Sequence, residues 1–401
     1  MKKILIAVVC LMLLAGFLSF FIYKISSKKV YIKKLDRKRF QLIVDNKPYI
    51  IKGVVYSPVP IGKDHAYDFW SDTLRPHLYD GKLMKEAGVN TIRVYQPGKD
   101  SLKTKKVMRE LYDKFGIRTG MGHWLGFWDS PNYADPDFRE SVKKDVAEMI
   151  RTYKDERGVL FWILGNENNV SFFRGSQTLN FWTTKEIEDL EDPYLKRKAR
   201  AKIYYSFVNE VSKMVHKIDP DRPVVLANAG FDDIDVASKV APDVDILGCS
   251  VYKGKTFGSF FREVNRLFKR PVFITEFGCD RYDAFLGKEA QEVQAEFIGA
   301  QWKEIEKNTF NGNGVGNSLG GFVFEWTDEW WKLNQDNEAG WYVHDTQASW
   351  SNGAYYFDIK APQNFNINEE WWGICSLERK GDKLDERRPT KAYFTLKELW
   401  K

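Results

Sequence analysis

The sequence predicts an α/β fold, a single (β/α)8 barrel, on three observations. Short apolar runs of strand length recur along the chain and alternate with segments of helical periodicity. Barrels of this kind commonly use a chain of this length, 401 residues, as one domain. Several of the runs end in a polar residue that a loop follows, which is where such a barrel carries its chemistry.

The N-terminal part of the chain has a composition of its own. Ile4 to Tyr23 is uncharged and long enough to span a bilayer, and bulky residues occupy the zone where a cleavage site would lie. We therefore expect residues 1–27 to form a signal-anchor or transmembrane helix, followed by a basic juxtamembrane arm, residues 28–39. A cleaved signal peptide is the alternative, and it would give a secreted protein.

The net charge of +6 also comes from this part of the chain. The first 39 residues hold ten Lys or Arg and one Asp, a balance of +9, so the remainder carries −3. Such a remainder has no basic face for nucleic acid, and we expect no nucleic-acid partner. The basic arm could instead contact anionic headgroups, or it could be a solvated linker.

Residues 40–401 are expected to form the barrel domain. Phe40–Val44 and Tyr49–Ile51 flank a turn of Asp, Asn, Lys and Pro, which is typical of a β-hairpin. We place this N-terminal hairpin across the bottom of the barrel. The eight predicted barrel strands are, in chain order, residues 52–56, 90–95, 117–123, 161–167, 223–228, 244–252, 271–276 and 321–326.

Helical segments are predicted between these strands. Apolar residues three and four apart run through residues 138–153, after the cap and first-turn pair Asp135-Pro136. Residues 203–218 and 107–115 repeat the pattern, and Pro and Gly respectively follow them. The connections after the fourth and eighth strands exceed ordinary loop length, so we expect both to shape a substrate cleft.

Two glutamates close strands that lie far apart in the sequence. Glu167 ends the fourth strand in Leu-Gly-Asn-Glu, and Glu276 ends the seventh in Thr-Glu-Phe-Gly. A parallel barrel brings such strand ends to one face. A retaining glycosidase needs two carboxyl groups about 5–5.5 Å apart, one as acid and base, the other as nucleophile. The pair therefore predicts glycoside chemistry, although either glutamate alone could be a structural hydrogen-bond acceptor.

The two motifs together resemble those of glycoside hydrolase clan A, retaining β-glycosidases built on the (β/α)8 barrel. The resemblance covers residues 52–326. It implies that Glu167 is the acid/base and Glu276 the nucleophile. Ile51-Lys52-Gly53-Val54 and Gly88-Val89-Asn90-Thr91-Ile92-Arg93 look most similar to family 2 barrels and to β-1,3-glucanosyltransferases.

The same resemblance implies five substrate-binding residues. It puts Arg93 and Tyr252 beside the nucleophile, Asn166 on the sugar 2-hydroxyl, His123 in contact with substrate, and Trp326 under the cleaved sugar. Each assignment has a competing interpretation. Arg93 could form an ordinary ion pair, Tyr252 could be a packing residue, and His123 could be a neutral, hydrogen-bonded side chain. The role expected of Trp326 could instead belong to Trp330, Trp331, Trp371 or Trp372.

Other side chains near the predicted strand ends allow two interpretations. The acidic residues Glu325, Asp328 and Glu329 could bind sugar hydroxyls or be solvated loop charges. Trp124, Phe127 and Trp128 could extend the cleft or anchor a loop. The five histidines are dispersed and the cysteines show no metal spacing, so we expect neither a metal site nor a cofactor.

The sequence thus predicts an enzyme, a retaining β-glycoside hydrolase that acts on an oligo- or polysaccharide. The aromatic content of 15%, with 14 Trp, suits sugar stacking. A transglycosylase using the same pair, a non-catalytic glycan-binding barrel and a metal-dependent hydrolase are the alternatives. More basic residues follow the apolar segment than precede it, which favours a cytoplasmic domain. Polysaccharide chemistry argues for the other side, so we expect a membrane-anchored barrel outside the cytoplasm.

Overall fold

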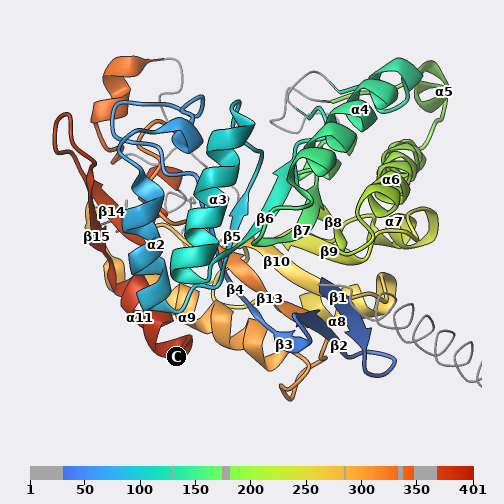
Figure 1. The fold of residues 1–401 in the computed structure, drawn as a ribbon. Helices are drawn as coiled ribbons and strands as arrows, with labels where there is room; N and C mark the ends of the chain where they lie inside the picture. Colours follow the sequence, from blue (N-terminus) through green and yellow to red (C-terminus); the bar gives the residue numbers. More distant parts are fainter. Residues whose placement is uncertain (1–29, 128–130, 174–180, 284–285, 333–336, 347–367) are drawn as a thin grey trace, which may run out of the picture.

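The chain forms a closed barrel of parallel strands surrounded by helices, as Figure 1 shows. The computed structural model describes residues 30–127, 131–173, 181–283, 286–332, 337–346 and 368–401. The barrel strands follow one another around the ring in chain order. They are β4 (Ile51–Val55), β5 (Thr91–Val94), β6 (Arg118–His123), β7 (Val159–Leu164), β8 (Val224–Ala229), β9 (Ile246–Ser250), β10 (Val272–Phe277) and β13 (Ser318–Val323). All eight predicted strands are confirmed.

Helices connect these strands on the outside of the barrel (Figure 1). They are α2 (Pro76–Ala87), α3 (Ser101–Phe115), α4 (Pro136–Tyr153), α5 (Lys185–Glu188), α6 (Pro193–Ile218), α7 (Ile234–Val240), α8 (Phe260–Leu267), α9 (Gln291–Lys307) and α11 (Lys391–Leu399). Short 3-10 helices are η1 (Phe69–Ser71), η2 (Asn168–Phe172), η3 (Glu338–Tyr342) and η4 (Glu369–Trp371).

Local signals set the helix ends where the sequence predicted them. The Asp135 side chain accepts a hydrogen bond from the Asp137 backbone N–H, and Pro136 begins α4. Helix α3 ends at Gly116, which has φ +76° and whose N–H donates to the Leu111 and Tyr112 carbonyls. A left-handed residue at this position favours glycine, since it has no Cβ to clash.

Aromatic rings fill the inside of the barrel. The ring centroids of Phe161, Phe273 and Phe322 form a cluster. The distances are 5.2 Å between Phe161 and Phe273, 5.5 Å between Phe273 and Phe322, and 6.4 Å between Phe161 and Phe322. Neighbouring strands make room with glycine: a Cβ on Gly53 would lie 2.3 Å from the Phe322 ring, and one on Gly120 would lie 2.5 Å from the Phe161 ring. The interior is therefore a packed core, so the chemistry has to lie at the ends of the strands.

A small antiparallel sheet closes the N-terminal end of the barrel, below the barrel in Figure 1. The predicted hairpin is confirmed as β2 (Phe40–Val44) paired with β3 (Lys47–Tyr49). A third strand that the sequence did not predict, β1 (Val30–Lys34), pairs with β2. Residues 30–34 therefore belong to the folded domain, although they lie within residues 28–39, which were expected to form a basic arm.

Near the C-terminus, β14 (Cys375–Glu378) and β15 (Glu386–Pro389) form an antiparallel hairpin. After β10, the short strands β11 (Tyr282–Asp283) and β12 (Lys288–Glu289) form a second antiparallel pair. A bridge joins Thr327 to Cys375. This hairpin and η4 build out the connection after β13 that was expected to shape the cleft. Within the described residues, no helix is long and apolar enough to cross a membrane. The predicted span, residues 4–23, lies outside them.

Candidate active site

Glu276 receives hydrogen bonds on both of its carboxylate oxygens. The Arg93 guanidinium donates to Oε1 at 2.6 Å and the Tyr95 hydroxyl donates to the same oxygen at 2.8 Å. The Tyr252 hydroxyl donates to Oε2 at 2.8 Å. An ionised carboxylate only accepts hydrogen bonds, so this set of donors matches the charged form. Glu276 is buried on β10, and the tyrosines follow β5 and β9.

Arg93 ties three barrel strands together at this point. Besides Glu276, its guanidinium donates to the Asn166 Oδ1 at 2.6 Å and to the Thr275 carbonyl at 3.1 Å. Arg93 is buried on β5, Asn166 follows β7 and Thr275 lies on β10. These three acceptors offset the large desolvation cost of burying a cation, although the buried Arg93 Nε has no partner among the described residues. The arginine therefore fixes the position of Asn166 relative to Glu276.

Glu167 lies in the turn after β7, half-buried, with a left-handed backbone of φ +58°. Burial and the nearby charge of Glu276 raise its pKa to about 8, against smaller opposing effects of the Ser250 hydroxyl and Arg93. This effect of Glu276 on Glu167 agrees with two carboxyl groups that face one site. At neutral pH Glu167 therefore holds a proton that it can donate.

The turn that presents Glu167 is held by Asn168. Its Oδ1 accepts from the Asn166 N–H at 2.7 Å, and its Nδ2 donates to the Trp124 carbonyl at 3.0 Å and to the Tyr133 hydroxyl at 2.7 Å. A left-handed conformation is strained for a residue such as glutamate, and such strain often marks functional positions. The fixed turn sets the direction of the Glu167 side chain.

His123 ends β6 as a neutral, half-buried side chain. Burial lowers its pKa to about 4. Its Nδ1 accepts a hydrogen bond from the Leu125 N–H at 3.0 Å, so in the neutral ring the hydrogen is on Nε2. The nearby Trp124 ring stacks on Tyr95, with centroids 5.0 Å apart and an angle of 15°. This aromatic pair lies next to the Glu276 carboxylate; Phe127 is buried and Trp128 lies outside the described residues.

Trp326 departs from the expected position under the sugar. Strand β13 ends at Val323, three residues before it, and the Trp326 side chain is 0% exposed. Its ring lies 6.3 Å from Tyr393 of α11, in the layer outside the barrel. The structure instead puts Trp372 next to Tyr252, with ring centroids 4.8 Å apart. The sequence could not choose between these tryptophans, because Trp372 comes from a distant loop.

Tyr95 and Ser250 are site residues that the sequence analysis missed. Tyr95 follows Arg93 by two residues, and Ser250 precedes Tyr252 by two. Alternate residues of a strand face the same side, so the two predicted positions already pointed to them. The alternation of side chains along a strand could therefore have identified both Tyr95 and Ser250.

The acidic residues after β13 are buried rather than solvated. Arg281 donates to both carboxylate oxygens of Asp328 at 2.6 Å. Glu325 and Glu329 are also buried, and Lys332 lies 3.2 Å from Glu329 and 2.6 Å from Glu369. A ring column of Trp330, His344, Trp371 and Tyr282 stacks beside them, with centroids 4.2, 3.5 and 5.0 Å apart.

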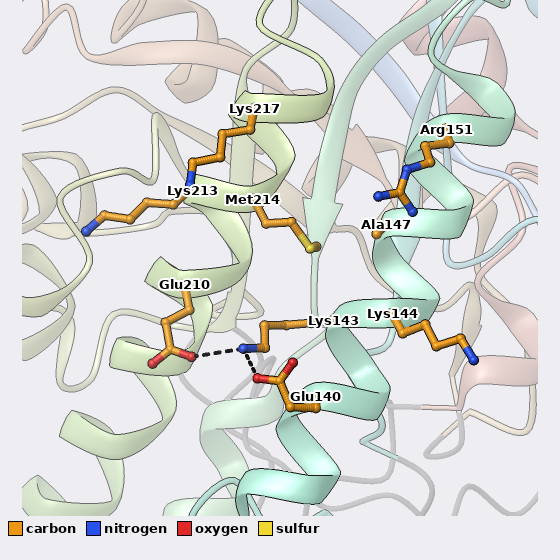
Figure 2. Close-up of a pocket in the computed structure, with 9 residues that line it drawn as sticks. All are labelled: Glu140, Lys143, Lys144, Ala147, Arg151, Glu210, Lys213, Met214 and Lys217. Atoms are coloured by element: carbon orange, nitrogen blue, oxygen red, sulfur yellow. Dashed lines mark ion pairs between the residues drawn. The ribbon is translucent and has the colours of Figure 1, made fainter.

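A separate hollow of about 540 Å³ lies on the outer surface between α4 and α6 (Figure 2). Its lining includes Lys144, Arg151, Lys213 and Lys217, and Lys143 forms ion pairs with Glu140 and Glu210. The hollow contains neither Glu167 nor Glu276. The described cysteines, Cys249, Cys279 and Cys375, are buried, and the described residues include no group of three or more His, Cys, Asp or Glu that could hold a metal ion.

The strands and helices form a (β/α)8 barrel, and Glu167 and Glu276 lie at the ends of two of its strands. No known family model matches the chain. A β-glucuronidase of Bacteroides fragilis is 29% identical over 167 residues, which cover 39% of this chain and 19% of that protein. The chain therefore spans about a fifth of the length of that curated relative.

Solved structures show the same fold at low identity. A Bacteroides uniformis β-glucuronidase has a TM-score of 0.57 at 17% identity, covering 93% of this chain and 37% of its own. A Dictyoglomus thermophilum β-D-glucuronidase gives 0.56 at 17%, covering 92% and 53%. A family 2 β-galacturonidase of Eisenbergiella tayi, bound to galacturonate, gives 0.56 at 15%, covering 93% and 53%.

Proposed function

We propose that this chain is a retaining β-glycoside hydrolase in which Glu276 is the nucleophile and Glu167 the acid/base. The observation that supports this most is the contrast between the two groups. Glu276 accepts from Arg93, Tyr95 and Tyr252, as an ionised nucleophile should, whereas the raised pKa of Glu167, about 8, keeps it protonated.

The reaction follows from these protonation states. A Glu276 oxygen attacks the anomeric carbon while the bond to the leaving oxygen breaks, and Glu167 gives that oxygen its proton. Glu276 is then a neutral ester, so the charge that helped to raise the pKa of Glu167 is gone. Glu167 can now take a proton from water as water attacks the anomeric carbon and releases Glu276.

The remaining residues have positioning roles in this proposal. Arg93 and Asn166 form one hydrogen-bonded unit with Glu276, so Asn166 can meet the sugar 2-hydroxyl beside the nucleophile. His123 can donate from Nε2, because its Nδ1 is already an acceptor. Trp326 has no role in this proposal, because its ring packs against Tyr393 of α11 in the layer outside the barrel.

Transglycosylation is the second candidate, because it uses the same glycosyl-enzyme with a sugar hydroxyl in place of water. The column of stacked rings from Trp330 to Tyr282 favours it, since flat rings on the loops after β10 and β13 can hold an acceptor sugar.

We also propose, from the apolar segment of residues 4–23, a membrane-anchored protein with the barrel outside the cytoplasm. Protease digestion of the barrel only after cell lysis would contradict that placement.

Azide rescue tests the two roles separately. Glu276→Ala and Glu167→Ala should each lower kcat/KM on aryl β-glycosides by about 10²- to 10⁴-fold or more. Azide should restore turnover of Glu276→Ala by attack from the nucleophile's face and give the α-glycosyl azide. With Glu167→Ala it should attack the glycosyl-enzyme from the opposite face and give the β-azide. The exposed Glu398→Gln is the matched control. The same anomer from both variants would refute the assignment.

A further inference from the structure

A group of carboxylates that the proposed reaction does not use borders the catalytic pair. We call Glu325, Glu329 and Glu369, together with Lys332 between them, the carboxylate wall. Glu325 lies two residues beyond the end of β13, and Glu369 begins η4. Lys332 Nζ lies 3.2 Å from Glu329 Oε2 and 2.6 Å from Glu369 Oε2. The loop after β13 and η4 thus meet at this wall.

Contacts place the wall beside the proposed nucleophile: the Glu325 N–H donates to the Trp372 carbonyl at 3.4 Å, and the Trp372 ring packs on Tyr252, whose hydroxyl donates to Glu276. Electrostatic effects agree with this placement. The charge of Glu276 contributes to raising the pKa of Glu329 to about 7, after burial and Glu369. The charge of Glu369 contributes to the raised pKa of Glu167. A sugar bound between Glu167 and Glu276 therefore has the wall as a neighbour.

Two buried oxygens of the wall, Glu325 Oε1 and Glu329 Oε2, have no hydrogen-bond partner within the described residues, and of these only Glu329 Oε2 has a cation nearby, Lys332 Nζ at 3.2 Å. Glu325 is 1% exposed, and its Oε1 is buried without a donor. Glu325 faces the rest of the wall, since burial and then the charge of Glu329 raise its pKa well above the ordinary value. An unpaired buried oxygen costs free energy in the empty site, and a hydroxyl donor from a ligand would remove that cost.

Arg93 and Lys332, the described cations beside the glutamate pair and the wall, are already paired. Arg93 is held by Glu276 and Asn166, and Lys332 is held by Glu329 and Glu369. Carboxyl groups therefore outnumber cations around the proposed sugar site. The known structures of similar fold include β-glucuronidases and a β-galacturonidase bound to galacturonate, whose sugars carry a carboxylate of their own.

Building on the proposed hydrolase function, we propose that this site takes neutral β-glycosides and rejects β-uronides, and that the carboxylate wall is the determinant. Hydroxyl groups of a neutral sugar can donate to the unpaired Glu325 Oε1 and to the other carboxyl oxygens of the wall. A uronate would bring a second carboxylate next to Glu276 and would find Lys332 already paired with Glu329 and Glu369. Like charges in a partly buried site repel strongly enough to decide specificity.

The test compares matched 4-nitrophenyl β-glycosides on the full chain. The neutral set is glucoside, galactoside and mannoside, and the acidic set is glucuronide and galacturonide. We expect the best neutral substrate to exceed the best uronide in kcat/KM by at least about tenfold. A uronide that is turned over as well as the neutral sugars, or better, would overturn the inference and leave the hydrolase function standing. Turnover of neither set, with no azide rescue, would defeat the hydrolase function itself.

Two variants then test whether the wall causes the preference. Glu329→Gln and Glu369→Gln each remove one charge and leave Lys332 less neutralised, so each should raise the uronide-to-neutral ratio of kcat/KM by about three- to tenfold. A ratio within one preparation does not depend on how much of the variant folds. Glu398→Gln, an exposed charge removed in the same way, should leave the ratio unchanged. An unchanged ratio in both wall variants would overturn the role of the wall.

Discussion

At the scale of single residues, Arg93 connects the groups on which the proposed chemistry depends. One guanidinium contacts Glu276, Asn166 and the Thr275 carbonyl, and so holds residues of β10 and of the turn after β7 in one geometry. Tyr95 and Tyr252 complete the surroundings of Glu276 from two further positions. The proposed nucleophile is thereby held in place before substrate binds, which is what preorganisation requires.

The pKa of Glu167 predicts the alkaline limb of the activity profile. Because the proposed first step needs Glu167 protonated, kcat/KM should be steady at neutral pH and fall as the pH rises through about 8. In Glu276→Gln the neighbouring charge is absent, so the pKa of Glu167 should drop. A ¹³C NMR titration of labelled glutamate would measure that shift, and an unmoved titration would show that the two groups do not interact.

Removing either tyrosine hydroxyl should slow the reaction without unfolding the protein. Tyr95→Phe and Tyr252→Phe each take one hydrogen bond from Glu276, and bonds to charged groups are worth about 1.5–3 kcal/mol, so we expect about a 10- to 100-fold loss of kcat/KM. Tyr49→Phe is the control, because that hydroxyl bonds Asn90 and Thr91 away from the site. Equal losses in the control would argue for a general packing effect.

At the scale of the elements, one buried ion pair holds together the loops that build the carboxylate wall. Arg281, after β10, pairs with Asp328, after β13, and also donates to the Trp371 and Gly373 carbonyls around η4. Breaking a buried pair leaves an uncompensated charge. These loops should therefore lose their arrangement together when the pair is broken.

Asp328→Ala should lower the free energy of unfolding by about 3–5 kcal/mol in urea titration. The exposed pair Arg157–Asp113 offers a comparison, and Asp113→Ala should change the same quantity by less than about 1 kcal/mol. Similar losses in both variants would mean that burial does not govern the Arg281 contact.

The barrel could be predicted from the sequence because each strand is a short apolar run with a clear end. The same local logic placed Glu167, Glu276, Arg93, Asn166 and Tyr252 at strand ends, where the structure has them. It failed for Trp326, since the last strand ends three residues earlier than the apolar run suggested. The partner Trp372 and the burial of Glu325 and Glu329 depend on contacts between distant loops, which no local pattern encodes.

At the scale of the whole molecule, the small N-terminal sheet belongs to the barrel domain. Val30, Phe40, Leu42 and Val44 are buried in the same core as residues of the barrel interior. The backbone N–H of Val30 donates to the Asp221 carbonyl at 3.2 Å. The sequence analysis assigned residues 30–34 to a basic arm, because β1 carries lysines at its exposed end.

Truncation should locate the start of the folded unit. A chain that begins at residue 30 retains β1 and should unfold with the free energy of the full chain. One that begins at residue 40 loses β1, its ladder with β2 and the buried Val30 side chain, so its free energy of unfolding should fall by about 2 kcal/mol or more. Equal stability of the two would show that β1 does not contribute to the domain.

The most direct measurement is to trap the glycosyl-enzyme and find its attachment point. A 2-deoxy-2-fluoro β-glycoside with a good leaving group forms the covalent intermediate and slows its hydrolysis, so intact and peptide mass spectrometry can locate the sugar. We predict a single adduct on Glu276, absent from Glu276→Gln. Steady turnover of aryl β-glycosides with an inverted product and no adduct, or an adduct on another residue, would contradict the account.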